Sequence, residues 1–263
     1  MARAIWLHFL NGVFMEKKPE FNLNAQLLTL IAHKLRTPLS IITGYCEALQ
    51  TQAKNSLSPF AGKALQEIGT QGTHLSQLVD KLLAFNKVFD TKEETLEKEE
   101  ILLKPLLKEC ASKALAQEEI LPSPASANTA TGSRRGTFVE TDCPEDLTLR
   151  ANKDMLRLCM QELLSNAIKF NARPEKIIKI HAVNHGASIS LSVRDYGAGI
   201  RSQDVERIFE PFYQVDDDFT GQVTGWGLGL TTVKRILELH HGSVSVVSDR
   251  GLGSIFTMNF PIL

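Results

Sequence analysis

The stretch that decides the fold is His33-Lys34-Leu35-Arg36-Thr37-Pro38-Leu39, which lies in a run whose apolar residues recur at helical spacing. This run extends from Asn22 to about Gln52, and a second run of the same kind follows a turn at Asn55–Pro59. The spacing predicts two long amphipathic helices joined as an antiparallel hairpin. Pro38 lacks an amide hydrogen and its ring crowds the preceding turn, so the first helix should kink and loosen beside His33.

A hairpin of this kind cannot bury the apolar faces of both helices by itself. Two hairpins that form a dimeric four-helix bundle would bury them, which predicts a homodimer. The alternative is that the hairpin packs against the rest of the same chain.

The remainder of the chain predicts a sheet with helices. Alternating or β-branched strands are expected at 176–183, 189–193 and 254–260, and helices at about 105–116, 154–170 and 228–240. This order favours an α/β sandwich in which helices cover one face of a sheet, so the fold class expected for the whole chain is α+β. The expected divisions are a tail at 1–21, the hairpin at 22–92, a charged linker at 93–100 and the sandwich at 101–263. Residues 121–136 are rich in Ser, Ala, Thr, Pro and Gly and predict a mobile insert.

Composition excludes several classes of protein. The 263 residues are 43% hydrophobic and 22% charged, a composition that suits two globular domains. The net charge of −1 gives no electrostatic reason to expect a nucleic acid as partner. The four cysteines form no CxxC pair, which indicates a reducing compartment, and we expect a cytoplasmic location. The segment Ala4–Leu10 is too short for a membrane span, which needs about 18 apolar residues, so no span is expected. That segment is either a tail or a weak signal-like sequence.

Three further motifs follow His33 in order along the chain. They are Asn166-Ala167-Ile168-Lys169, Asp195-Tyr196-Gly197-Ala198-Gly199 and Gly225-Trp226-Gly227-Leu228-Gly229-Leu230. From about Asn22 to the C-terminus, the order and the residue types resemble the sensor histidine kinases of two-component signalling. The resemblance implies a dimerisation and histidine-phosphotransfer domain followed by a Bergerat-type ATP-binding domain. It also implies that ATP and Mg²⁺ are cofactors, that His33 is phosphorylated, and that the phosphate passes to an aspartate of a response regulator receiver domain.

The residues of the expected nucleotide site have chemistry that suits ATP. Asp195 ends an alternating strand, and its carboxylate can accept the exocyclic amine of adenine, while Gly197 and Gly199 would let the backbone approach a flat ring. Gly225, Gly227, Leu228 and Gly229 precede or begin a helix whose free amides and dipole suit a triphosphate. The pattern is not a dinucleotide fingerprint, because a polar segment rather than a strand precedes the glycines and Leu230 occupies the position of the third glycine. The chain has no Walker A motif either.

The helix before the strand adds groups for the phosphates and a metal ion. Asn166 offers an amide oxygen that suits Mg²⁺, and Lys169 shares its helical face and can meet a phosphate. Glu162 lies on the same face, where the family mostly has asparagine; it is either a polar residue of the metal shell or a base for hydrolysis. Phe209 begins a phenylalanine-rich segment that resembles the border of the family's flexible lid, expected here at about 200–224.

The phosphoacceptor segment matches the family in part. A neutral imidazole is a competent nucleophile near pH 7, and in the family the residue matching Thr37 positions water for dephosphorylation. Arg36 is either a phosphate or partner contact or a solvated charge. Lys34 replaces the acid that usually accepts the imidazole proton, and no Lys or Arg lies between Phe212 and Lys234 to offer a cation from the lid.

These departures leave rival functions open. One is a nucleotide-binding signalling scaffold with weak or no kinase activity. The other is an ATPase or protein-serine kinase of the same superfamily, against which the complete motif around His33 argues.

Overall fold

The computed structural model describes residues 25–52, 58–120, 136–215 and 226–262, with the side chains of 25–34, 37, 38, 50, 52, 119 and 120 left outside the description. The chain divides into two compact units, Met1–Asn86 and Lys87–Leu263. The expected tail, most of the turn between the two long helices and residues 121–135 of the expected insert lie outside the described residues.

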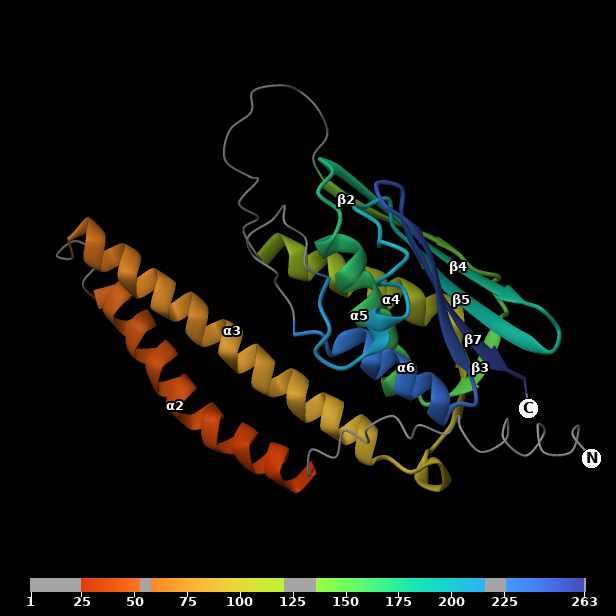
Figure 1. Ribbon diagram of the computed structural model, residues 1–263, viewed down its shortest axis with the longest axis horizontal. Coiled ribbons are helices and arrows are strands. Elements are labelled where there is room, and N and C mark those ends of the chain that lie inside the picture. The colour runs from red at the N-terminus through yellow and green to blue at the C-terminus, as the bar shows by residue number, and fades with distance from the viewer. Residues whose placement is uncertain (1–24, 53–57, 121–135, 216–225, 263) are drawn as a thin grey trace, which may run out of the picture. The chain divides into compact units, whose positions relative to one another are not determined.

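The first unit contains the predicted helical hairpin, formed by α2 (Ala25–Gln52) and α3 (Pro59–Asp90), the last turn of which belongs to the second unit (Figure 1). Helix α2 continues through Pro38 without interruption, so the loosening expected beside His33 does not break the helix. None of the helices in the described ranges has the length and apolar composition that a bilayer span requires.

Small and apolar side chains join the two helices. A Cβ on Gly72 of α3 would lie 2.8 Å from Cγ2 of Thr43 on α2, and Leu39 and Val79 are buried between the helices. Other large apolar side chains on the hairpin remain exposed, namely Leu35, Ile41, Ile42, Tyr45, Leu49, Phe60, Ile68 and Leu75. Within its unit, therefore, the hairpin leaves much of its apolar surface uncovered.

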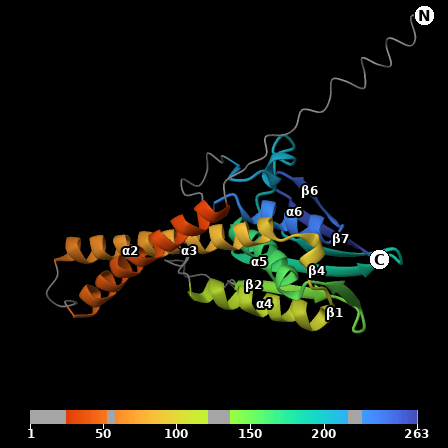
Figure 2. The same ribbon diagram turned by 90° about the horizontal axis from the view of Figure 1, so that it is seen from below.

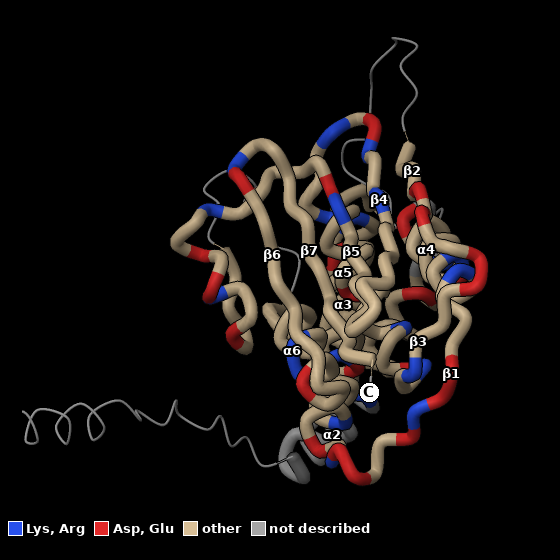
Figure 3. The backbone as a smooth tube through the Cα atoms, turned by 90° about the vertical axis from the view of Figure 1, so that its right-hand side faces the viewer, with Lys and Arg blue, Asp and Glu red and all other residues tan. Residues whose placement is uncertain are grey.

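The second unit is a sandwich of helices on a sheet. Its elements are η1 (Glu93–Thr95), β1 (Glu99–Leu102), α4 (Leu103–Ile120), β2 (Gly136–Asp142), β3 (Thr148–Ala151), α5 (Lys153–Lys169), β4 (Glu175–Asn184), β5 (Ser188–Arg194), η3 (Arg207–Phe209), α6 (Gly229–Leu239), β6 (Ser243–Asp249) and β7 (Gly253–Pro261). Five strands form a sheet in the order β2-β4-β5-β7-β6, in which β2 runs parallel to β4 and the other pairs are antiparallel (Figure 3). Strands β1 and β3 form a separate antiparallel pair.

Helices α4, α5 and α6 cover one face of the five-stranded sheet (Figures 1 and 2). Alternate residues of the central strands point into this core. Examples are Ile180 of β4, Leu191 of β5 and Met258 of β7, each at most 1% exposed. The α+β class and the three predicted strands, β4, β5 and β7, are therefore confirmed.

Strands β1, β2, β3 and β6 were not predicted from the sequence. Glu99 and Glu100, expected in a linker, pair with Ala151 and Arg150 as part of β1, so the sheet pair begins before the expected boundary. Gly136, expected to end the insert, begins β2. Neither segment carries a long alternating apolar pattern, because β1 is short and β2 lies at the edge of its sheet.

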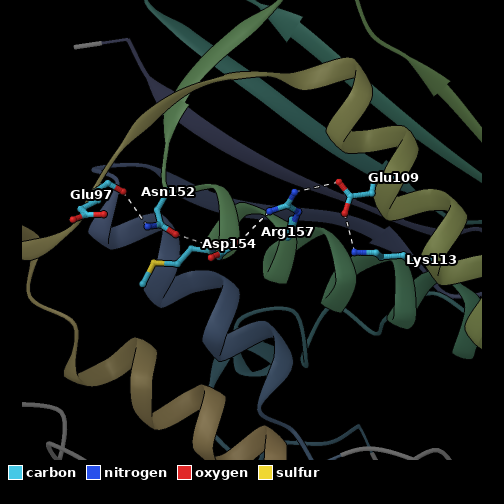
Figure 4. Close-up of polar contacts among 7 residues, drawn as sticks. Glu97, Glu109, Lys113, Asn152, Asp154 and Arg157 are labelled. Atoms are coloured by element: carbon cyan, nitrogen blue, oxygen red, sulfur yellow. Dashed lines mark hydrogen bonds and ion pairs between the residues drawn. The ribbon is translucent and has the colours of Figure 1, made fainter.

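Asn152 fixes the start of α5. Its Oδ1 accepts the amide of Met155 and its Nδ2 donates to the carbonyl of Glu97 (Figure 4). Its own amide donates to Nε2 of His240 at 3.0 Å. Nδ1 of His240 lies 2.7 Å from the carbonyl of Ile236, so the ring is neutral with its proton on Nδ1, and burial lowers the pKa of this histidine. One residue thus ties the segment after α3 to the start of α5 and the end of α6.

Arg157 joins α5 to α4. Its guanidinium pairs with Glu109 of α4 at 3.2 Å and with Asp154 at 3.1 Å, and Glu109 also pairs with Lys113 at 2.8 Å (Figure 4). These ion pairs fix the relative positions of two helices that cover the sheet.

A crossing of three backbone segments lies where β5 ends. The amide of Ala198 donates to the carbonyl of Phe170 after α5, and a Cβ on Gly197 would lie 2.3 Å from that oxygen. Gly199, at φ +69°, passes the turn between β6 and β7, where a Cβ would lie 2.0 Å from the carbonyl oxygen of Asp249. A side chain at Gly197 or Gly199 would therefore push apart backbone segments that are in contact.

We predict that Gly199→Ala destabilises the second unit more than Gly251→Ala does. Both positions have positive φ, so both substitutions carry the left-handed cost of about 1–2 kcal/mol, but a Cβ at Gly251 meets nothing within 4 Å. Overlap with Asp249 should lower the free energy of unfolding of Gly199→Ala by about 1–3 kcal/mol more. Urea unfolding followed by circular dichroism measures the difference; equal losses would show that the crossing is not tight.

Candidate functional site

Asp195 lies at the end of β5 with its side chain turned into the protein. The residue is 7% exposed, its backbone amide donates to the carbonyl of Ser254, and the amide of Gly197 donates to its Oδ1 at 2.8 Å. Burial raises the pKa of this carboxyl, and the amides of Gly197 and Ser254 oppose the rise. No side chain in the described part of the chain bonds this carboxylate, so backbone amides alone hold it.

The C-terminal turns of α5 lie beside this loop, because Phe170 directly follows the helix and its carbonyl accepts the amide of Ala198. Nζ of Lys169 lies over the half-exposed ring of Phe170, 4.5 Å from its centroid. Asn166 and Lys169 are both partly buried on the same helix. The structure therefore brings the predicted amide and amine to the neighbourhood of Asp195.

The start of α6 is the third part of the site. Gly227 has φ +66°, Leu228 precedes the helix without a side-chain cap, and no acid lies in the first turn. Glu162 of α5 approaches this end, since a Cβ on Gly229 would lie 2.3 Å from its Oε2. Gly225, predicted to be part of this glycine motif, lies outside the described residues.

The segment with Phe209 packs against the start of α6. The carbonyl of Phe209 accepts the hydroxyl of Thr231 at 3.1 Å, and the amide of Phe212 donates to the carbonyl of Gly227 at 2.8 Å. A Cβ on Gly227 would overlap the backbone of Phe212. Of the expected lid, residues 216–224 lie outside the described part of the chain.

Asp204 anchors this segment and was not found from the sequence. It is 3% exposed, and its carboxylate accepts the hydroxyl of Tyr213 at 2.7 Å and Nε of Arg201 at 2.9 Å. The Tyr213 hydroxyl and the Arg201 guanidinium hold the pKa of Asp204 below its usual value, although burial opposes them. The guanidinium of Arg207 stacks on the Tyr213 ring at 4.2 Å. Residues 201–207 are short of apolar side chains and look like an ordinary polar loop in the sequence, which hides the buried acid.

The predicted phosphoacceptor residues belong to the other unit. His33, Lys34 and Thr37 lie on α2, and their side chains are outside the description. Arg36, left open as a partner contact or a solvated charge, pairs with Asp80 of α3, and both side chains are exposed.

The arrangement can bind a purine nucleotide in chemical terms. It presents a buried carboxylate held by backbone amides, a helix start without a side-chain cap, and amide, amine and carboxylate groups from one neighbouring helix. Among the described residues, no group of three or more His, Cys, Asp and Glu could hold a metal ion by itself.

Comparison with known proteins identifies the two units. Residues 23–88 match the family described as the His Kinase A (phospho-acceptor) domain, and residues 151–263 match the histidine kinase-, DNA gyrase B-, and HSP90-like ATPase family.

Relatives extend the match over most of the chain. An uncharacterized sensor-like histidine kinase of Rhizobium meliloti is 30% identical over 90% of this chain and 42% of its own length. The sensor histidine kinase RcsC of Escherichia coli is 30% identical over 90% of this chain and 23% of its own length. The chain thus spans less than half of either relative.

A solved structure, full-length ShkA in complex with AMPPNP, has the same fold with a TM-score of 0.65. It is 24% identical, and the match covers 90% of this chain and 45% of that one. With both domains matched, and with relatives named as sensor histidine kinases similar over 90% of it, the chain belongs to the sensor histidine kinases of two-component signalling.

Proposed function

We propose that the chain is an ATP-dependent protein histidine autokinase that is phosphorylated on His33 and passes the phosphate to an aspartate of a response regulator receiver domain. The observation that carries the proposal is the Asp195 carboxylate, which is buried at the end of β5 and held by backbone amides, with Gly197 bonded to its Oδ1. An acceptor fixed in this way suits the exocyclic amine of adenine, because it is ordered before the ligand arrives.

The start of α6 and the end of α5 would hold the triphosphate of a nucleotide whose adenine meets Asp195. The amides of Gly227, Leu228 and Gly229 lie at the start of α6, which has no side-chain cap, and can donate hydrogen bonds to phosphate oxygens. Lys169 supplies a positive charge from the end of α5. Phe209 closes one side of this region through its contact with Thr231. Gly197 and Gly199 contribute by letting the loop after Asp195 pack closely against neighbouring backbone, so that no side chain at either position blocks the approach of adenine.

Mg²⁺ is the metal ion that these residues suit. Asn166 offers an amide oxygen and Glu162 a carboxylate from the same helical face, and both are hard ligands. Because the described residues contain no larger acidic cluster, the ion would complete its coordination with phosphate and water oxygens, as Mg²⁺ usually does in nucleotide sites. The ion would neutralise phosphate charge.

His33 accepts the γ-phosphoryl group of ATP as a neutral imidazole, and ADP is the leaving group. Thr37, one turn later, orients the water that hydrolyses the phosphoaspartate of the regulator to aspartate and inorganic phosphate. The exposed apolar side chains of α2 and α3, such as Ile41 and Phe60, support a homodimer in which two hairpins form a four-helix bundle. The His Kinase A match over residues 23–88 supports the same assignment.

Incubation with γ-labelled ATP and Mg²⁺ tests the reaction. We expect label on the chain that is lost in acid and retained in alkali, as for phosphohistidine, and we expect no label on His33→Gln. Acid-stable label would indicate a serine or threonine kinase instead. Nucleotide binding without label would indicate a scaffold, or an ATPase if phosphate is released.

Lys34→Glu should accelerate labelling. General-base assistance is worth about 10²–10⁴-fold in rate, and a glutamate at this position can accept the imidazole proton, which an ammonium cannot. Lys63→Glu, at an exposed position on α3, is the control for the change in charge and should leave the rate unchanged. A fast wild-type rate that collapses in Lys34→Glu would mean that Lys34 stabilises the transferring phosphoryl group.

A further inference from the structure

One turn of the second unit holds an aromatic residue in a conformation that glycine usually adopts. The amide of Tyr213 donates to the carbonyl of Glu210 at 3.3 Å, which closes the turn. Pro211 occupies its second position and Phe212 its third, with φ +61°. A positive φ at the third position is the feature of a type II turn, which normally has glycine or asparagine there. In a residue with a side chain this conformation is disfavoured by about 5- to 30-fold in population, so contacts outside the turn must hold Phe212 in it.

The backbone of this turn lies against residue 227, just before α6. The amide of Phe212 donates to the carbonyl of Gly227 at 2.8 Å. A Cβ on Gly227 would lie 2.5 Å from the carbonyl carbon of Phe212 and 2.6 Å from the carbonyl oxygen of Tyr213. The conformation of Phe212 therefore sets the position of Gly227, which is the first of the residues whose amides are proposed to bind phosphate.

The hydroxyl of Tyr213 is held by a buried acid. It donates to Oδ1 of Asp204 at 2.7 Å, while Nε of Arg201 donates to Oδ2 at 2.9 Å. Asp204 is 3% exposed, and its backbone carbonyl accepts the amide of Ile208 at 3.0 Å. A hydrogen bond to an ionised carboxylate is stronger than one between neutral groups, and this acceptor is fixed on both sides. The bond therefore ties the ring next to the strained residue to an ordered part of the second unit.

We propose that Tyr213 is a positioning residue for the phosphates of the nucleotide. Its hydroxyl, bonded to Asp204, holds Phe212 at positive φ, and the turn in this conformation places Gly227 and the start of α6. Tyr213 itself would touch no phosphate. This role rests on the proposed nucleotide site and deepens it, because it names the contact that orders the phosphate end of the site before the ligand arrives.

Calorimetry of AMPPNP in Mg²⁺ with the full chain measures this role in Tyr213→Phe, which removes the hydroxyl and keeps the ring. Without the bond to Asp204 the turn can relax, so the fraction of chains with the start of α6 in place falls. The affinity for AMPPNP should then fall by roughly 5- to 30-fold. The affinity for adenosine, which has no phosphate, should not change, since other backbone contacts hold Asp195. Tyr45→Phe, the same change at a tyrosine of α2 that is 69% exposed, should leave both affinities unchanged.

Substitutions at Phe212 show whether the strained conformation is the cause. Glycine adopts positive and negative φ about equally, so in a Phe212→Gly background Tyr213→Phe should weaken AMPPNP binding only about twofold. Phe212→Ala also lacks the aromatic side chain but keeps the unfavourable positive φ. In that background the loss caused by Tyr213→Phe should remain roughly 5- to 30-fold. Equal losses in the two backgrounds would overturn the inference.

The same titrations separate this inference from the proposed function. If the wild type does not bind AMPPNP, the nucleotide site fails and this role of Tyr213 with it. If the wild type binds AMPPNP and Tyr213→Phe binds it equally well, or loses affinity for adenosine to the same extent, the inference alone is overturned. Should Tyr213→Phe not fold, as judged by circular dichroism, Asp204→Asn carries the same comparisons, because it weakens the same hydrogen bond by removing the charge.

Discussion

The backbone crossing at residues 197–199 is the contact on which the candidate site depends. The loop after β5 passes between the end of α5 and the turn that joins β6 to β7, at distances that only glycine permits at Gly197 and Gly199. Because peptide groups rather than long side chains make these contacts, the loop has little freedom to move. Asp195 is thereby held by backbone amides, and the same crossing places the C-terminal turn of α5, which contains Asn166 and Lys169, beside the loop that follows it.

Much of the fold could be predicted from the sequence, because the need to bury one face of a helix or strand leaves a regular spacing of apolar residues. The long amphipathic runs predicted α2 and α3, and strict alternation predicted the central strands β5 and β7, each of which has one face in the core. The motifs around His33 and Asp195 predicted the family, which the two domain matches confirm.

The rest depended on tertiary contacts that leave little trace in one sequence. Strand β1 has only four residues, and its partner β3 is distant in the chain. The glycines after Asp195 were expected to admit a flat ring, and the structure adds a packing requirement against Phe170 and Asp249 that the sequence did not reveal. Asp204 is an ordinary loop residue by composition, and only the fold brings Tyr213 to its carboxylate. The position of Glu162 at the start of α6 could not be foreseen, since it requires the angle at which α5 and α6 meet.

Calorimetry of ATP and inosine triphosphate with the wild type and Asp195→Asn tests most directly whether Asp195 reads adenine. Inosine presents an oxygen where adenine presents its amine, so the wild type should bind ATP more tightly by about 10- to 100-fold, the worth of a hydrogen bond to a charged group. Asp195→Asn retains an oxygen for the amide of Gly197, so it should fold normally while its preference for ATP collapses. Equal binding of the two nucleotides by the wild type, or an unchanged preference in the variant, would contradict this role for Asp195.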